Sequence, residues 1–296
     1  MKPHRECPLC IVSVRLNEVA SAQINDSKVI EASSLVLEES AKAFRSENEL
    51  TRIASSIYAK LVSKYPEVIE YYRDAKRRSI DNAKAQLASI KSALNGLSGF
   101  DLFKAAVRVS IAGNLLDMGV ASHKPPSELP LNSIMSIPFS IDHTGELYSM
   151  LSNGGLRILW LFDNAGEAVF DIILIDLIRG MGNTITGVAK AEPGFQNDLT
   201  ISDAEYAGLS NHLDELISTG YAGSSIHLDK VNGEFLSKLK ASDLVVAKGM
   251  AHFEYLSEVD LGKPIVFLLV PKCEPVARVL NVNKGTLVAM LRQVKS

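Results

Sequence analysis

The chain has 296 residues, of which 47% are hydrophobic and 22% are charged, and its formal net charge is -3. This length and composition are those of a globular protein with one large domain or two smaller ones. The slight acidity gives no general electrostatic support for binding to nucleic acid. The apolar runs are too short for a membrane-spanning helix. We therefore expect neither nucleic acid nor a membrane as a partner.

Two further features concern the cellular compartment. The first residues, from Met1 to Cys7, contain no apolar segment of the kind found in secretory signals. The three cysteines are an odd number, which argues against a disulfide framework. Together these features predict a cytoplasmic protein.

The first part of the chain has the apolar spacing of helices. From residue 10 to about 94 apolar side chains recur at helical intervals, for example at Ile53, Ile57 and Leu61. Residues 100–117 have the pattern of another buried helix. The proline-rich segment 123–138 should interrupt helical structure and form a connection. We therefore predict a mainly helical N-terminal region over residues 1–122.

After this connection the spacing changes. Short apolar runs predict strands, and the segments between them have helical patterns. Such alternation is typical of βαβ units and a mainly parallel sheet. The predicted fold class is thus α/β, with a helical region packed on a Rossmann-like three-layer α/β/α domain over residues 123–296, including a connection at 123–150. The predicted strands are 156–162, 182–189, 244–247 and 264–270, and the predicted helices between them are 168–179, 204–218 and 233–240.

An Asp163-Asn164 pair stands between a predicted strand and a predicted helix. In open α/β sheets ligands bind outside the carboxyl ends of the strands. Two oxygen-bearing side chains at such a place can hold a divalent cation or orient a phosphate. The alternative is that the pair only caps the helix.

A second polar group follows the predicted strand 182–189. It contains Asp198 and Thr200, with Asp203 three residues further on. The alternative here is a helix start, in which Asp198 or Thr200 is the cap and Asp203 lies in the first turn.

A third polar group follows the predicted strand 244–247. Gly249 would allow a tight backbone turn near a ligand, and Lys248 could meet a phosphate as a point charge. The alternative is an ordinary surface lysine beside a loop.

The three groups together make a specific proposal. Adjacent parallel strands would bring Asp163, Asn164 and Asp198 to one cation, with Lys248 beside it. Two carboxylates and an amide favour a hard or borderline ion such as Mg²⁺ or Mn²⁺. Such an ion polarises a phosphoryl oxygen or activates a water molecule, and a lysine can balance the charge of the phosphoryl group.

With these motifs the sequence resembles the metal-dependent damage-control phosphatases, a family formerly catalogued as domain of unknown function eighty-nine. The string Asp-Asn-Ala-Gly-Glu at 163–167 is the most specific part of the resemblance. The matching segments keep the family's order and run from near the N-terminus to near the C-terminus. They are 113–117, 163–167 with 170–171, 197–200, 248–249 with 253–254, and 272–273 with 275–276.

The resemblance implies a helical N-terminal part, a Rossmann-like domain and phosphatase activity on phosphorylated metabolites, typically sugar phosphates or damaged intermediates. It implies that Asp163, Asn164 and Asp198 are metal ligands with catalytic roles and that Lys248 contacts the phosphate. The substrate-binding residues that it implies are Asn114, Asp117, Glu167, Lys248, His252 and Glu254.

The chain departs from the family pattern at one of these positions. His252 stands where the family usually has Asn. The histidine either changes specificity and adds a titratable group or is a tolerated replacement that hydrogen-bonds the backbone.

Cys7-Pro8-Leu9-Cys10 near the chain start has two interpretations. One is a pair of buried or helix-starting cysteines. The other is a metal or redox role, although no second Cys-x-x-Cys or His pair completes a zinc site. The microbial branch of the family also carries an N-terminal Cys-x-x-Cys, which places this chain in that branch.

The sequence therefore predicts a divalent-metal-dependent phosphomonoester hydrolase. Its cofactor would be Mg²⁺, Mn²⁺, Co²⁺ or Ni²⁺ and its partner a phosphorylated small molecule. The nucleophile is either a metal-activated water or a carboxylate, and the absence of an Asp-x-Asp signature favours water. The main alternative is a protein that binds the metal and a phosphate ligand without turnover. A nucleotide-binding transferase would need a glycine-rich phosphate loop, which the sequence lacks. The oligomeric state is not predicted.

Overall fold

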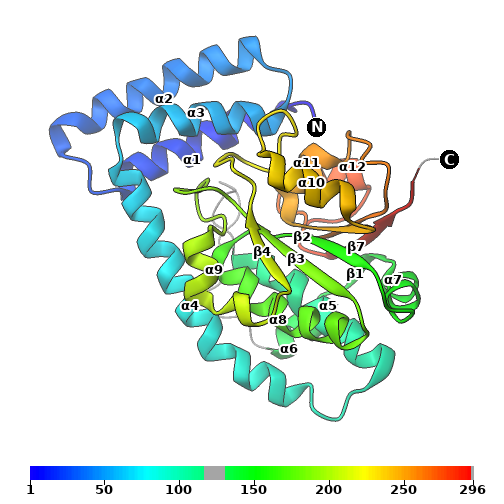
Figure 1. Ribbon diagram of the computed structural model, residues 1–296. Coiled ribbons are helices and arrows are strands. Elements are labelled where there is room, and N and C mark those ends of the chain that lie inside the picture. The colour runs from blue at the N-terminus through cyan, green and yellow to red at the C-terminus, as the bar shows by residue number, and fades with distance from the viewer. Residues whose placement is uncertain (117–130, 295–296) are drawn as a thin grey trace.

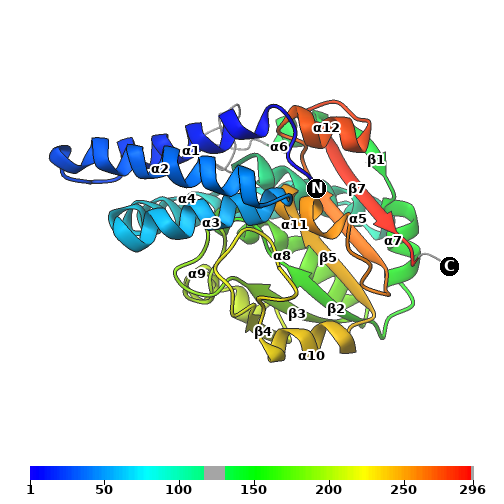
Figure 2. The ribbon, with the colours of Figure 1, turned by 90° about the horizontal axis from the view of Figure 1, so that it is seen from above.

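Four helices begin the chain in the computed structural model, which describes residues 1–116 and 131–294. Helices α1 (Cys7–Ser21), α2 (Asp26–Ser46) and α3 (Leu50–Lys64) lie together at one end of the molecule. The long α4 (Glu67–Ala93) runs from them along the α/β body (Figure 1, Figure 2). The predicted helical N-terminal part is confirmed.

Local sequence signals explain where these helices begin and which face they bury. The Asn25 side chain accepts a hydrogen bond from the Ser27 amide and caps α2. Pro66, whose fixed φ suits a helix start, directly precedes α4. Ile53, Ile57 and Leu61 are at most 1% exposed, so the predicted apolar stripe of α3 faces the core.

A seven-stranded sheet forms the centre of the α/β body. Its strand order is β1-β7-β6-β5-β2-β3-β4, and the only antiparallel pair among the described strands is β6 with β7. This confirms the predicted α/β fold with a mainly parallel sheet. The strands are β1 (Phe139–Asp142), β2 (Arg157–Leu161), β3 (Thr184–Ala189), β4 (Glu215–Ser218), β5 (Leu244–Lys248), β6 (Ile265–Leu269) and β7 (Leu287–Arg292).

Helices cover both faces of the sheet, and the side chains of β2 alternate between the two resulting cores. Ile158 and Trp160 pack in one core with α4, α5 and α8, whereas Leu159 and Leu161 pack in the other with α10, α11 and α12. Because both faces are buried, the central strands are continuous apolar runs. The further helices are α5 (Gly99–Ala112), α7 (Thr144–Leu151), α8 (Ala165–Gly180), α10 (Gly233–Ala241), α11 (Gly249–Leu256) and α12 (Glu274–Leu280), and a short 3₁₀ turn covers Gly113–Leu116.

Two of the predicted element assignments are wrong. The predicted helix 204–218 is instead α9 (Ile201–Ala207), a short 3₁₀ turn and strand β4. Gly208, with a φ of 83°, ends α9 in the left-handed region. In the proline-rich segment, the described residues include a short helix, α6 (Leu131–Ser136). Strands β1, β4 and β7 had not been predicted.

The helical part and the sheet share one core. Phe103 of α5 and Ile80 of α4 belong to the same apolar cluster as Trp160 of β2. The division of the chain at residues 122 and 123 stays a prediction. Among the described helices, none combines the length and apolarity needed to cross a membrane.

Strand β3, between β2 and the edge strand β4, provides a test of the packing. A Cβ atom at Gly187 would lie 2.5 Å from Leu213 Cδ1 and 2.9 Å from Phe162 Cε2. We expect Gly187→Ala to lower the free energy of unfolding by about 1–3 kcal/mol because it overpacks this core. Gly180→Ala, which meets no atom within 4 Å, is the control. Urea denaturation measures both, and equal stabilities of the two variants would contradict the packing described here.

Candidate metal and phosphate site

The carboxyl ends of three adjacent strands meet at one edge of the sheet. Strand β2 lies between β5 and β3, and Leu161 pairs with Ala247 on one side and Val188 on the other. The chain reaches β3 through α8 on one side of β2, whereas β5 lies on the other side. Such a switch in strand order opens a crevice at the carboxyl edge. The three polar groups found in the sequence all follow strands at this crevice.

The backbone fixes the Asp163-Asn164 pair beside Asp198. The Leu199 amide donates to the Asp163 carbonyl at 2.8 Å, and the Ala165 amide donates to the Asn197 carbonyl at 3.0 Å. Asp163, Asn164 and Asp198 are only 3–6% exposed, and all three line one cavity. The structure therefore brings the three expected metal ligands together.

The alternative that Asn164 is only a helix cap does not describe its side chain. Asn164 occupies the N-cap position of α8, but its side chain makes no capping hydrogen bond. Its Nδ2 instead donates to Asp163 Oδ2 at 2.9 Å and to Glu167 Oε2 at 3.1 Å. In the second group Thr200 is the cap of α9, with Asp203 in a capping box. Asp198 is therefore not needed as a cap.

A second amide joins the same two carboxylates. Asn114 Nδ2 lies 2.8 Å from Asp163 Oδ2 and 2.8 Å from Glu167 Oε2. Two amide groups thus hold one oxygen of Asp163 and one of Glu167 in place. Gly249 allows this arrangement, because its φ is 76° and a Cβ there would lie 1.8 Å from Asp163 Oδ2.

Lys248 lies behind this layer and is fully buried, so it is not an ordinary surface lysine. Its Nζ is 2.8 Å from Glu167 Oε1 and 2.7 Å from Asp171 Oδ1, and it also donates to the Ser110 carbonyl at 2.8 Å. Burial alone would lower the pKa of Lys248, but Asp171 and Glu167 outweigh it and raise that pKa. Burial raises the pKa of Asp171 to about 6, although Lys248 opposes the shift.

Lys190 is a functional candidate that the sequence reasoning missed. It follows β3 directly, is 2% exposed, and its Nζ lies 3.7 Å from Asp198 Oδ2. Burial lowers the pKa of Lys190, while Asp198 and Asp163 oppose this shift. Its place immediately after a predicted strand, like that of Lys248, was the signal that could have identified it.

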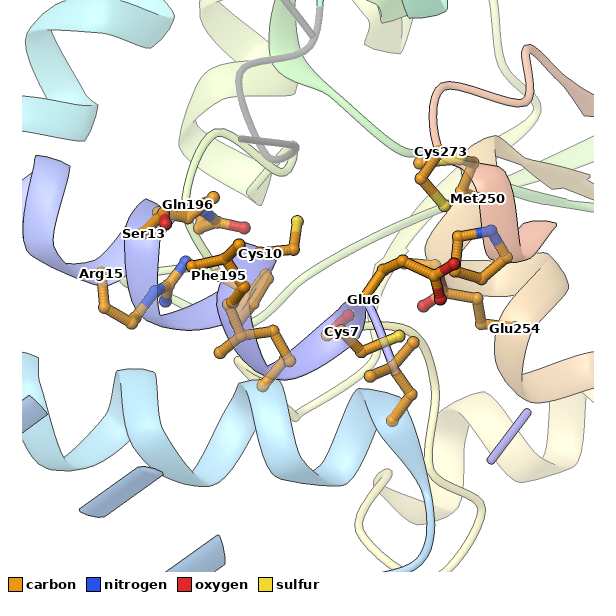
Figure 3. A pocket seen from close by; sticks show the side chains of 18 of the residues that line it. Glu6, Cys7, Cys10, Ser13, Arg15, Phe195, Gln196, Met250, Glu254 and Cys273 are labelled. Atoms are coloured by element: carbon orange, nitrogen blue, oxygen red, sulfur yellow. The ribbon is translucent and has the colours of Figure 1, made fainter. Parts of the chain in front are cut away.

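The cavity has a volume of about 740 Å³ and lies between the sheet edge and residues of helices α1, α3, α11 and α12 (Figure 3). Its sheet side includes Asp163, Asn164 and Asp198, and α11 contributes Met250 and Glu254. Residues of α1 and α12 complete the wall. Of the predicted substrate-binding residues, Glu254 lines the cavity. Asn114, Glu167, Lys248 and His252 are at most 2% exposed and lie behind the wall, and Asp117 lies outside the described residues.

Both ring nitrogens of His252 have hydrogen-bond partners. Its Nε2 lies 3.1 Å from the Phe162 carbonyl and its Nδ1 lies 3.1 Å from Ser225 Oγ. Burial holds the pKa of His252 well below its usual value, and Lys190 adds to the effect. A neutral His252 that donates from Nε2 therefore ties the end of β2 to α11.

All three cysteines line the same cavity. Cys7 is the first residue of α1, and Cys273 precedes α12. Burial raises the pKa of the Cys7 thiol. Burial, together with the nearby Glu254, raises the pKa of the Cys273 thiol to about 12. Both thiols are therefore protonated at neutral pH. Within the described residues no three His, Cys, Asp or Glu side chains are placed to hold a metal ion. A redox or metal role for Cys7 and Cys10 stays a prediction.

The geometry thus defines a class of protein with an oxygen-ligand crevice at the carboxyl edge of an α/β sheet. The protein-family model for the damage-control phosphatase ARMT1-like domain matches residues 4–288 of this chain. The chain belongs to this family.

Two named relatives support the assignment over the whole chain. A protein of Archaeoglobus fulgidus named damage-control phosphatase is 35% identical over 98% of this chain and 99% of its own length. Damage-control phosphatase PH1575 of Pyrococcus horikoshii is 32% identical over the full length of both chains. The crystal structure of PH1575, described as a DUF89 family protein, matches all of this chain and all of its own with a TM-score of 0.82 at 28% identity.

The ion-pair cluster behind the cavity wall leads to a stability prediction. Lys248→Met leaves Glu167 and Asp171 buried without their cation, and we expect the free energy of unfolding to fall by about 3–5 kcal/mol. Asp171→Asn in the Lys248→Met background should recover part of this loss. Urea denaturation of the single and double variants measures the coupling. A Lys248→Met variant as stable as the original protein would show that the ammonium does not hold these carboxylates.

His252 leads to a prediction about pH. As the pH falls below 6.5, the histidine of the unfolded chain takes up a proton, whereas the buried ring stays neutral. The free energy of unfolding should therefore fall by up to about 1.4 kcal/mol per pH unit from this one group. His252→Asn, which keeps an amide donor for the Phe162 carbonyl, should reduce this slope. Thermal unfolding at a series of pH values measures it, and identical slopes in both proteins would contradict the prediction.

Proposed function

We propose that this chain is a divalent-metal-dependent phosphatase that hydrolyses phosphomonoesters of small metabolites. One observation carries the proposal, namely the convergence of Asp163, Asn164 and Asp198 on a cavity at the carboxyl edge of the sheet. The names of the two relatives support phosphatase as the class of activity. Sugar phosphates and damaged phosphate-bearing intermediates are the substrates that the family resemblance favours.

The donor set fits a divalent cation. Asp163 and Asp198 offer carboxylate oxygens, and hard cations prefer such ligands. Because Asn164 directs its Nδ2 to Asp163 and Glu167, its carbonyl oxygen Oδ1 is left for the cation. Mg²⁺, Mn²⁺, Co²⁺ and Ni²⁺ all suit two carboxylates and an amide. When bound, the cation would supply positive charge for the phosphoryl oxygens or lower the pKa of a water molecule.

The chain's own groups would orient the phosphate ester. Helix α8 begins directly after Asn164, and the first amides of a helix are good donors to a phosphate. Asn114, which Glu167 anchors, would hold Asp163 in its orientation. Glu254 would contact the substrate from the cavity wall. A contact of Lys248 with the phosphate stays a prediction, because it requires the ammonium to leave Glu167 or Asp171. Water is the nucleophile that we propose.

The test is hydrolysis of an aryl phosphate and a panel of sugar phosphates by metal-stripped protein with each divalent metal added back. We expect metal-dependent turnover, and we expect Asp163→Ala to lower it by at least about a hundredfold because a cation ligand is lost. Asp176→Ala is the matched control, because it removes a partly exposed carboxylate on α8, the helix that follows Asp163.

The outcomes separate the alternatives. Turnover that survives in Asp163→Ala would remove this site from consideration. Stoichiometric metal binding without turnover of any ester would favour the non-catalytic binding protein. Absence of both metal binding and turnover would leave the Asp163-Asn164 pair without a catalytic role.

A further inference from the structure

Arg15 of α1 is a buried cation with unused hydrogen-bond donors. Its side chain is 3% exposed, and its Nη2 pairs with Glu18 Oε1 at 2.8 Å. Its Nε and Nη1 are also buried, and neither has a hydrogen-bond partner among residues 1–116 and 131–294. Buried donors of a charged group are expensive to leave unsatisfied. The structure therefore gives a reason to look for an external acceptor.

Arg15 belongs to the wall of the cavity that contains Asp163 and Asp198. Figure 3 shows it near Ser13, Phe195 and Gln196, on the opposite side of the view from Glu254 and Cys273. The guanidinium carbon lies 4.9 Å from the Tyr58 ring centroid and 5.5 Å from that of Phe195. Two aromatic rings thus hold the guanidinium in a fixed place.

Glu18 sets the direction of the guanidinium. Glu18 Oε1 accepts from Tyr72 at 2.5 Å and from Gln196 Nε2 at 3.0 Å, in addition to its pair with Arg15. These partners come from α4 and from the loop that carries Asp198. Because Glu18 occupies only one edge of the planar guanidinium, the donors Nε and Nη1 remain for another group.

The Arg15 cluster is also tied to the candidate metal ligands. The Asp198 amide donates to the Phe195 carbonyl at 3.0 Å, so the stacked ring and the carboxylate belong to one turn. An ester with its phosphoryl group at Asp163 and Asp198 would therefore extend its organic part into a cavity that Arg15 also lines.

We propose that Arg15 is a substrate-binding residue that hydrogen-bonds the organic part of the phosphate ester. Its Nε and Nη1 would donate to an oxygen acceptor there, either a carboxylate or a hydroxyl. Since Glu18 already balances the charge of Arg15, an uncharged hydroxyl is as acceptable as a carboxylate. The inference rests on the proposed function, and it adds a specificity determinant from the helical part of the chain.

Phosphonates are the probes for the test, because they bind as phosphate esters do but cannot be hydrolysed. Three kinds are compared by calorimetry on the metal-loaded protein. They are phenylphosphonate, which has no further oxygen, and two series of alkyl phosphonates of increasing chain length that end in a hydroxyl or in a carboxylate. The two series distinguish the two sources of the acceptor oxygen.

Arg15→Lys is the main variant, because it keeps a positive charge beside Glu18 but loses the guanidinium fork. We expect its affinity for one of the oxygen-bearing series to fall about ten- to a hundredfold more than its affinity for phenylphosphonate. Arg73→Lys is the matched control, since Arg73 also pairs with a glutamate three residues away on a helix but lies on the exposed surface. If Arg15→Lys unfolds, the double variant Arg15→Met with Glu18→Gln removes the charge pair as a unit.

Each outcome decides the inference. If Arg15→Lys loses affinity equally for all three kinds of phosphonate, or loses none, the inference is overturned. Arg15 would then have only a structural role or no role in binding. A selective loss in the hydroxyl or the carboxylate series supports it and names the acceptor. Failure of the proposed function can be distinguished from failure of this inference. In that case the protein would not hydrolyse phosphate esters, but its selectivity among the phosphonates would still depend on Arg15.

Discussion

The burial of acidic side chains at the carboxyl edge of the sheet is the constraint on which this structure depends. Asp163, Asp198, Glu167 and Asp171 are all at most 6% exposed. Buried carboxylates are costly unless cations or hydrogen-bond donors compensate them. Lys248 compensates Glu167 and Asp171 in the layer behind the cavity. A divalent cation in the cavity would do the same for the two aspartates, of which Asp198 lies 3.7 Å from the Lys190 ammonium.

Strand order explains how so much charge can be gathered in one place. Residues after β2, β3 and β5 are far apart in the chain, but these strands are neighbours in the sheet. Parallel strands direct their carboxyl ends to one edge, and the change of direction beside β2 leaves a crevice there. The amides of Asn114 and Asn164 then fix the carboxylates without adding charge. The placement of Asp163 close to Asp198 thus follows from topology as much as from residue type.

Much of this arrangement could be predicted from the sequence, because the central strands are strong apolar runs with polar residues at their ends. The adjacency of Asp163, Asn164 and Asp198 follows from parallel pairing of those strands. The directions of side chains do not follow from pattern. The pattern does not predict, for example, that the Lys248 ammonium lies on Glu167 and Asp171, and its predicted contact with a phosphate stays a prediction. The sequence predicts a helix where β4 lies, because the strand is at the edge of the sheet and three of its four residues are only partly buried.

The environment of Arg15 also cannot be predicted from the sequence pattern. Its position indicates that the helical part and the sheet edge have different roles in substrate binding. Nothing in the helical spacing of α1 distinguishes this arginine from a solvated one, since its environment comes from Tyr58, Phe195 and Glu18. Under the proposed function, the sheet edge would supply the groups that bind the cation and the phosphate, and every phosphate ester has this phosphate. The cavity wall made by α1 would then face the organic part, in which such esters differ. Changes on α1 could therefore alter substrate choice without disturbing Asp163, Asn164 and Asp198.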